Sequence, residues 1–180
     1  GHVEVVGCIL TCRGADLNVR DNNGISAINI AKENKRFRVI ELLEVVERLQ
    51  VACQNGILGE VKSFLSNPTL NPNCLGEGGA TPFYSACRRG DIQLMNVLLN
   101  NERIDVNKPN YFGATPFHIA CKNGDIEVVK LLLNDERIER NEVDNDNRTP
   151  FYQVCWNGHI EIVKLLLNDK KTDIRLANNS

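Results

Sequence analysis

Cysteine and histidine are the residues of this 180-residue chain best suited to chemistry, and it has seven cysteines and three histidines. Thiols pair as disulfides, bind zinc together with histidine, or act as nucleophiles beside a base. Four of them recur at a constant step of 34 residues, as Cys53, Cys87, Cys121 and Cys155. This step predicts one thiol in each of several packed helical units. Packed helices lie about 8–10 Å apart, whereas a disulfide spans at most roughly 7 Å between Cα atoms. We therefore predict that these four thiols are reduced, buried and poorly accessible.

The other candidate residues do not form a catalytic, metal or cofactor site. Cys8 and Cys12 have helical i, i+4 spacing, but two thiols without a histidine partner make a poor zinc site. His2, His118 and His159 have no serine, cysteine or carboxylate at the spacing of a nucleophile and its base. Neither a G-x-G-x-x-G motif nor a G-x-x-x-x-G-K-[ST] motif is present. The sequence therefore predicts a protein that is not an enzyme and that needs no metal or cofactor.

Charge and hydropathy argue against two further classes of function. The formal net charge is −2, and basic and acidic residues are interleaved without a basic stripe, so nucleic acid is not predicted as a partner. No apolar run approaches the ~18 residues needed to cross a bilayer, so membrane insertion is not predicted. Reduced thiols in a core predict an intracellular, cytoplasmic protein. Because the chain opens at Gly1 in the middle of a repeat pattern, we expect it to be a fragment of a longer protein.

The four cysteines belong to a longer internal repeat. The sequence GATPFYSAC at residues 79–87 recurs as GATPFHIAC at 113–121 and as NRTPFYQVC at 147–155. The same step backwards aligns Ala52 and Cys53 with Ala86 and Cys87, and a weaker copy starts at residue 24. A repeat of this length is the signature of a stacked array of small structural units.

Each unit contains the signals of two short helices and a loop. Thr81 followed by Pro82 starts the first helix, because the hydroxyl caps free N–H groups and proline suits the first helical position. Gly90 stops that helix, and Asp91 caps a second one with apolar residues at helical spacing. Residues 100–111 are polar and contain Asn, Asp and Pro, as expected of an extended connector with turns.

These motifs resemble the ankyrin repeat over nearly the whole chain. Residues 115–120, TPFHIA, match its helix start, residues 158–166, GHIEIVKLL, match its second helix, and residues 14–18, GADLN, match its finger loop. The sequence departs from the family in having Phe after the proline and a 34-residue step, where about 33 is usual. Tetratricopeptide repeats also have a 34-residue period, but their units are nearly all helical and their Trp, Gly and Tyr positions are absent here. The resemblance implies a structural role for His118, hydrogen-bonded to the backbone between neighbouring units.

The predicted fold class is therefore all-α, an ankyrin-repeat solenoid. We expect a lone helix at about 2–12, and five pairs of helices after it. The first helices of the pairs should centre on 26–34, 48–54, 81–89, 115–123 and 149–157, and the second helices on 36–44, 57–66, 91–100, 125–134 and 159–168.

One irregularity interrupts the repeat near its start. From Ser26 to the equivalent Glu47 there are 21 residues in place of 34, so one finger is missing. Residues 36–54 contain no Gly, Pro or Asn on which to turn, and their composition favours helix. We predict one long helix over 36–54 that closes a first array (1–44, a lone helix plus one repeat) and opens a second one (45–180), with the two arrays out of line. The second array would comprise repeats 45–78, 79–112, 113–146 and 147–180. A kinked corner with ordinary stacking is the alternative.

The resemblance also implies where a partner would bind. In ankyrin repeats the groove is lined by the finger tips and by the two residues before the glycine between the helices. The predicted partner-binding residues are Arg88, Arg89, Tyr111, Phe112, Lys122, Asn123, Arg148, Trp156 and Asn157, with Asn145 and Asp146 at the next finger tip. Tyr, Trp and Arg dominate interface hot spots. The alternative is that Phe112 and Trp156 only pack on neighbouring fingers or cover an end of the array.

The predicted function is that of a protein–protein interaction scaffold. A solenoid presents an extended concave surface, and the partner would dock on residues 80–160, anchored by Tyr111, Phe112 and Trp156. The basic residues suggest that the partner carries an acidic rim. The alternative is that the chain is the regulatory or targeting region of a larger enzyme or signalling protein whose catalytic part lies outside it.

Overall fold

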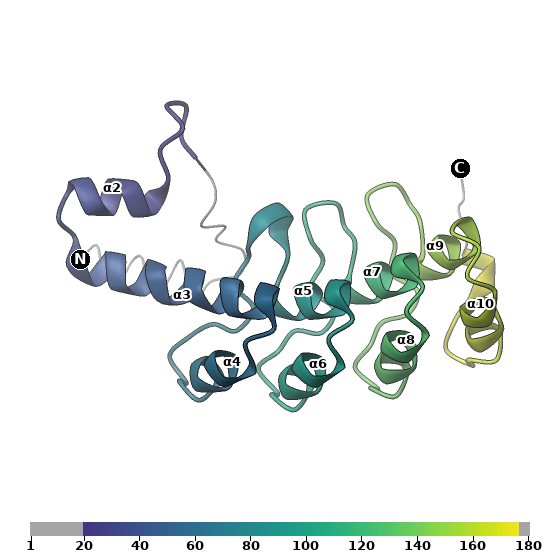
Figure 1. The fold of residues 1–180 in the computed structure, drawn as a ribbon. Helices are drawn as coiled ribbons and strands as arrows, with labels where there is room; N and C mark the ends of the chain where they lie inside the picture. Colours follow the sequence, from purple (N-terminus) through teal and green to yellow (C-terminus); the bar gives the residue numbers. More distant parts are fainter. Residues whose placement is uncertain (1–19, 177–180) are drawn as a thin grey trace.

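The computed structural model describes residues 20–176, which form a series of helices joined by loops (Figure 1). The helices are α2 (Ala27–Glu33), α3 (Phe37–Asn55), α4 (Leu58–Leu65), α5 (Pro82–Arg89), α6 (Ile92–Leu99), α7 (Pro116–Asn123), α8 (Ile126–Leu133), α9 (Pro150–Trp156) and α10 (Ile160–Leu167), with short 3-10 turns η1 (Glu77–Gly79) and η2 (Ile174–Leu176). The predicted all-α fold and the helix pairs within 20–176 are confirmed. The lone helix predicted at 2–12, the finger at 14–18, Cys8 and Cys12 lie outside the described residues.

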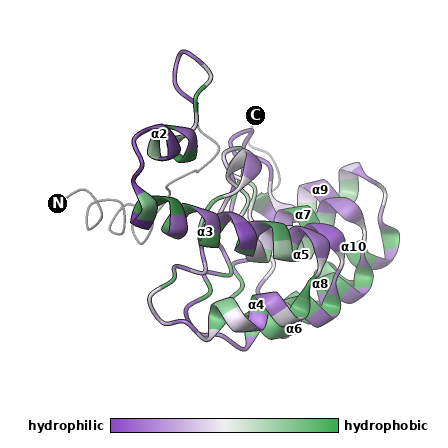
Figure 2. Ribbon diagram, turned by 60° about the vertical axis from the view of Figure 1, so that its left-hand side comes forward, coloured by the Kyte–Doolittle hydropathy of each residue, from purple (hydrophilic) through white to green (hydrophobic). Residues whose placement is uncertain are grey.

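The helices are arranged in two rows. The inner row consists of α3, α5, α7 and α9, and the outer row consists of α4, α6, α8 and α10 (Figure 1). The finger loops rise from the inner row on the side away from the outer row (Figure 1). Each helix carries both hydrophobic and hydrophilic residues (Figure 2), as expected when one face is buried against the neighbouring unit.

The Thr-Pro pairs start the inner helices as predicted. The Thr115 hydroxyl accepts a hydrogen bond from the backbone N–H of His118, with proline at the first helical position. Thr81 and Thr149 cap α5 and α9 in the same way. At the other end of α7, Gly124 has φ +76°, the left-handed conformation that glycine adopts without strain. Each unit therefore fixes the ends of its own first helix by local chemistry.

The core runs continuously through the two rows. Phe83 and Phe117, each 1% exposed, lie fully inside it, whereas the equivalent Phe151 is partly buried against it. The outer helices contribute an aliphatic stripe, such as Val128 and Leu132 in α8. Burying one such side chain stabilises the fold by about 1.5–3 kcal/mol. Each unit buries this surface only against its neighbours, which is why the units depend on stacking.

A ladder of asparagines joins the loops that follow the outer helices. The Asn107 amide donates to the carbonyl of Arg137 at 2.6 Å, and its Oδ1 accepts from the Glu139 N–H at 2.9 Å. Asn73 and Asn141, one step of 34 residues to either side, make the same pair of bonds to the next unit. In each of these loops, the asparagine side chain thus holds one unit to the next by two hydrogen bonds.

The predicted long helix is confirmed. α3 is one uninterrupted helix of 19 residues, and its C-cap is Gly56, which has φ +72°. Its first half packs on α2, and its second half packs on α4 and α5. α2 lies on the finger side of α3, whereas α4 lies on the opposite side, so α2 continues neither row (Figures 1 and 2). The division into arrays at 1–44 and 45–180 stays a prediction.

The prediction for the repeated thiols is confirmed at three positions and wrong at the fourth. Cys53, Cys87 and Cys121 are buried free thiols, and burial raises the pKa of Cys53 to about 12. Cys155 is exposed. The physical reason is that α7 and α9 cover the thiols of the units before them, while no helix in the described part of the chain covers the equivalent face of α9.

Candidate functional site

A groove runs between the inner helices and the fingers. Its hollow has a volume of about 570 Å³ and is lined from α5, α7 and α9 on one wall and from the fingers around residues 77–80, 110–114 and 144–148 on the other. Of the predicted partner-binding residues, five line this hollow: Arg88, Phe112, Lys122, Asp146 and Arg148. Phe112 is 69% exposed, although burying a large apolar side chain lowers the free energy.

The groove continues past α9 as an aromatic ledge. The ring centroids of Tyr152 and Trp156 are 5.9 Å apart with an interplanar angle of 17°, and Trp156 is 74% exposed. The Arg148 guanidinium lies over the Tyr152 ring, 6.0 Å from its centroid. A second hollow of about 210 Å³ brings these three residues together with Lys122 and Asn157. The sequence analysis missed Tyr152, which its position one turn before Trp156 on the same helix could have revealed.

Three predicted residues make contacts between units and do not line either hollow. The Arg89 guanidinium donates to the Gln54 carbonyl at 2.7 Å, and the Asn123 amide donates to the Arg88 carbonyl at 2.9 Å. Both bonds join the ends of successive inner helices. The Tyr111 ring lies so close to Gly79 that a methyl group there would be 2.6 Å from the ring.

The other two finger-tip residues are also held by neighbours. Asn145 donates from its backbone to the Phe112 carbonyl and from its side chain to the Tyr111 carbonyl. Asp146 pairs with Arg148 at 3.2 Å. Asn145 therefore joins two fingers, whereas the Asp146–Arg148 pair lies within one finger, and the Phe112 ring stays exposed beside them.

His118 forms part of the groove wall and has the structural role that the resemblance implied. Its Nε2 lies 2.9 Å from the Arg148 carbonyl, so this nitrogen donates, and its Nδ1 accepts from the Thr115 N–H at 3.1 Å. Burial lowers the pKa of His118, which favours this neutral form. Both nitrogens are thereby occupied in holding a finger to an inner helix.

The two walls of the groove differ in charge. Arg88 and Lys122 extend from the helix wall, and neither makes an ion pair with the described residues. The finger wall carries Glu77, Asp144 and Asp146. Asp144 accepts hydrogen bonds from the backbone of Asp146 and Arg148, and Asp146 pairs with Arg148. Among the described residues, the charges left without an ion pair are therefore basic on the helix wall, at Arg88 and Lys122, and acidic on the finger wall, at Glu77.

Over residues 20–176, no three or more His, Cys, Asp or Glu side chains are grouped as a metal site would require. None of the helices in that range combines the length and the apolar character that a bilayer crossing requires.

Comparison with known proteins agrees with this geometry. A family model described as ankyrin repeats (3 copies) matches residues 49–142 and residues 102–178, which together make up more than half of the chain. No curated protein sequence matches it. Ankyrin repeats are generally protein–protein interaction modules and are typically non-catalytic. The helix pairs, the fingers and the family match together show that this chain belongs to the ankyrin repeat family.

Proposed function

We propose that the chain is a scaffold that binds a partner protein in the groove between its inner helices and fingers. The observation that carries the proposal is the exposure of Phe112 and Trp156, 69% and 74%, beside the two hollows of the groove. Neither ring belongs to the buried core of its own unit. Aromatic side chains beside pockets are typical interface anchors.

The charge of the groove indicates what the partner offers. Arg88 and Lys122 follow one another along the helix wall at a step of 34 residues, without ion pairs of their own in the described part of the chain. A partner with an acidic rim would meet both, and its association rate would fall as salt is raised. Arg89, Asn123 and Tyr111 would support this surface from behind through their bonds and contacts with neighbouring units.

The test starts with a partner captured from a lysate, identified and purified, whose dissociation constant is then measured by calorimetry. Replacing Trp156 or Phe112 by Ala should weaken binding by at least tenfold, as expected for hot-spot residues. Lys164→Ala is the control, because Lys164 is exposed on the outer helix α10 and pairs only with Glu161 among the described residues. Equal binding by all variants, or loss only in Lys164→Ala, would contradict the proposal.

A further inference from the structure

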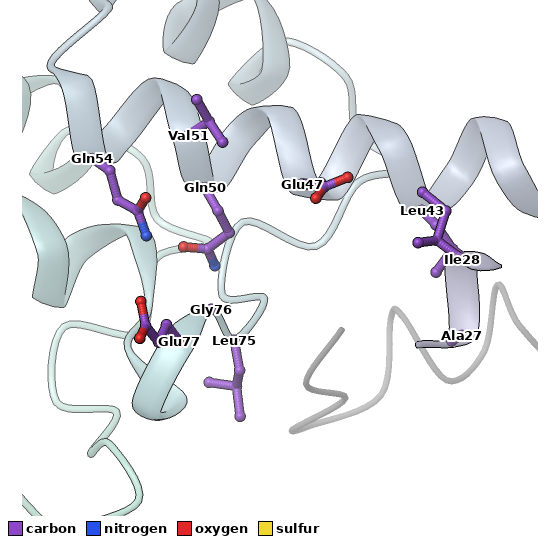
Figure 3. A pocket seen from close by; sticks show the side chains of 10 residues that line it. All are labelled: Ala27, Ile28, Leu43, Glu47, Gln50, Val51, Gln54, Leu75, Gly76 and Glu77. Atoms are coloured by element: carbon purple, nitrogen blue, oxygen red, sulfur yellow. The ribbon is translucent and has the colours of Figure 1, made fainter. Parts of the chain in front are cut away.

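The missing finger leaves a cleft beside the long helix. The cleft has a volume of about 170 Å³ and lies between α2, α3 and the finger that precedes α5, which contains η1. Figure 3 shows Glu47 and Gln50 on α3, with Leu75, Gly76 and Glu77 of the finger on one side and Ile28 of α2 on the other. In a regular unit the preceding finger would cover this face of η1.

Successive fingers are joined by one backbone hydrogen bond, and this series is incomplete at the cleft. The Asn145 N–H donates to the Phe112 carbonyl at 3.0 Å, and one step earlier the Tyr111 N–H donates to the Gly78 carbonyl at 3.1 Å. The equivalent donor of the finger before α5 is the Glu77 N–H, and it has no partner among residues 20–176. The carbonyl that would accept it belongs by register to Glu44, which lies inside α3.

The side chains around the cleft are acceptors and apolar groups. Glu47 and Glu77 are exposed carboxylates, and no Lys, Arg or His is among the described residues that line the cleft. Gln50 is 94% buried and donates its amide to the Cys74 carbonyl at 2.6 Å, which leaves its Oε1 without a hydrogen-bond partner. The volume of about 170 Å³ has room for an extended side chain of several heavy atoms, such as that of lysine.

We propose that this cleft binds an extended segment of a partner protein that takes the place of the missing finger and inserts a lysine or arginine side chain. A carbonyl of the segment would accept from the Glu77 N–H. The inserted cation would lie between the carboxylates of Glu47 and Glu77 and would bring a donor to the Gln50 oxygen, while its methylene groups pack on Ile28 and Leu75. Glu77 also lines the groove hollow, but Glu47, Gln50 and Ile28 line only this cleft and Trp156 lines neither, so the cleft can be tested independently of the Trp156 anchor.

The test uses peptides and nuclear magnetic resonance of the full 180-residue chain. The probe is the blocked tripeptide acetyl-Gly-Lys-Gly-amide, and the matched probe has norleucine in place of lysine. We expect the lysine peptide to shift the Glu77 amide resonance saturably. Glu47→Gln and Glu77→Gln should each weaken binding about threefold, as expected for the loss of one partly exposed ion pair. Glu41→Gln, on an exposed position of α3 away from the cleft, and Trp156→Ala should leave binding unchanged.

Three results would overturn the inference. Equal binding of the norleucine peptide would show that the cation is not recognised. An equal effect of Glu41→Gln would show non-specific attraction to an acidic helix. Slow hydrogen exchange of the Glu77 amide before any peptide is added would show that the chain itself fills the place of the missing finger.

Discussion

Replacing Asn107 by Ala tests the hydrogen-bond ladder that joins the units. The substitution removes two bonds to the next loop, to the Arg137 carbonyl at 2.6 Å and from the Glu139 N–H at 2.9 Å. Each such bond contributes about 0.5–1.5 kcal/mol net, so the free energy of unfolding should fall by about 2 kcal/mol. For a chain of this size that corresponds to a decrease in Tm of about 4–8 °C.

The assay is urea denaturation followed by circular dichroism, together with hydrogen exchange at the Glu139 amide. That amide should exchange faster in Asn107→Ala because it loses its acceptor. Asn168→Ala is the control, since the side chain of Asn168 bonds only to the Lys164 carbonyl of the preceding helix α10, and it should change stability by less than about 0.5 kcal/mol. The reasoning would be refuted if the two variants lost the same stability, or if the Glu139 amide exchanged at the wild-type rate.

Three further predictions address thiols, pH and helix ends. A thiol reagent without denaturant should label Cys155 quickly and Cys121 slowly, read by peptide mass spectrometry; equal rates would contradict the burial pattern. Burial lowers the pKa of His118 from 6.5, so its contribution to the free energy of unfolding should be complete above about pH 6.5 and be lost below it, because there the unfolded chain takes up a proton. In urea titrations at two pH values, His118→Gln should therefore lose less stability on acidification than the wild type. An equal loss would count against this. Gly124→Ala should destabilise more than Gly158→Ala, since both sites have positive φ but only Gly124 lies against the His159 ring; equal thermal shifts would rule out that contact as the cause.

The residues that line the groove could be predicted only in part. The repeat register put Arg88, Lys122 and Phe112 along the groove, because equivalent positions of a repeat occupy equivalent places in space, and their role in binding stays a prediction. The register could not show that Arg89 and Asn123 are occupied by bonds to the preceding unit. Those bonds depend on the distance between inner helices, which is set by packing and is not encoded in any single unit.

The local structure was determined by the sequence alone. Thr-Pro at helix starts, glycine at helix ends and the apolar stripes act within a few residues of the chain, so the helices, their 34-residue step and the long helix α3 followed directly from the residues. The absence of any turn residue between positions 36 and 54 was sufficient to predict the break in the repeat.

Only the tertiary structure decided what each repeated residue contacts. Cys121 and Cys155 are the same residue in the same motif, yet one is fully buried and the other is exposed, because burial depends on whether another helix packs on that face. The cleft beside α3 likewise arises from a finger that is missing. The Glu77 N–H at this cleft has no hydrogen-bond partner among residues 20–176, and the sequence around Glu77 does not reveal this. Contacts between units are long-range, so no local pattern of residues specifies them.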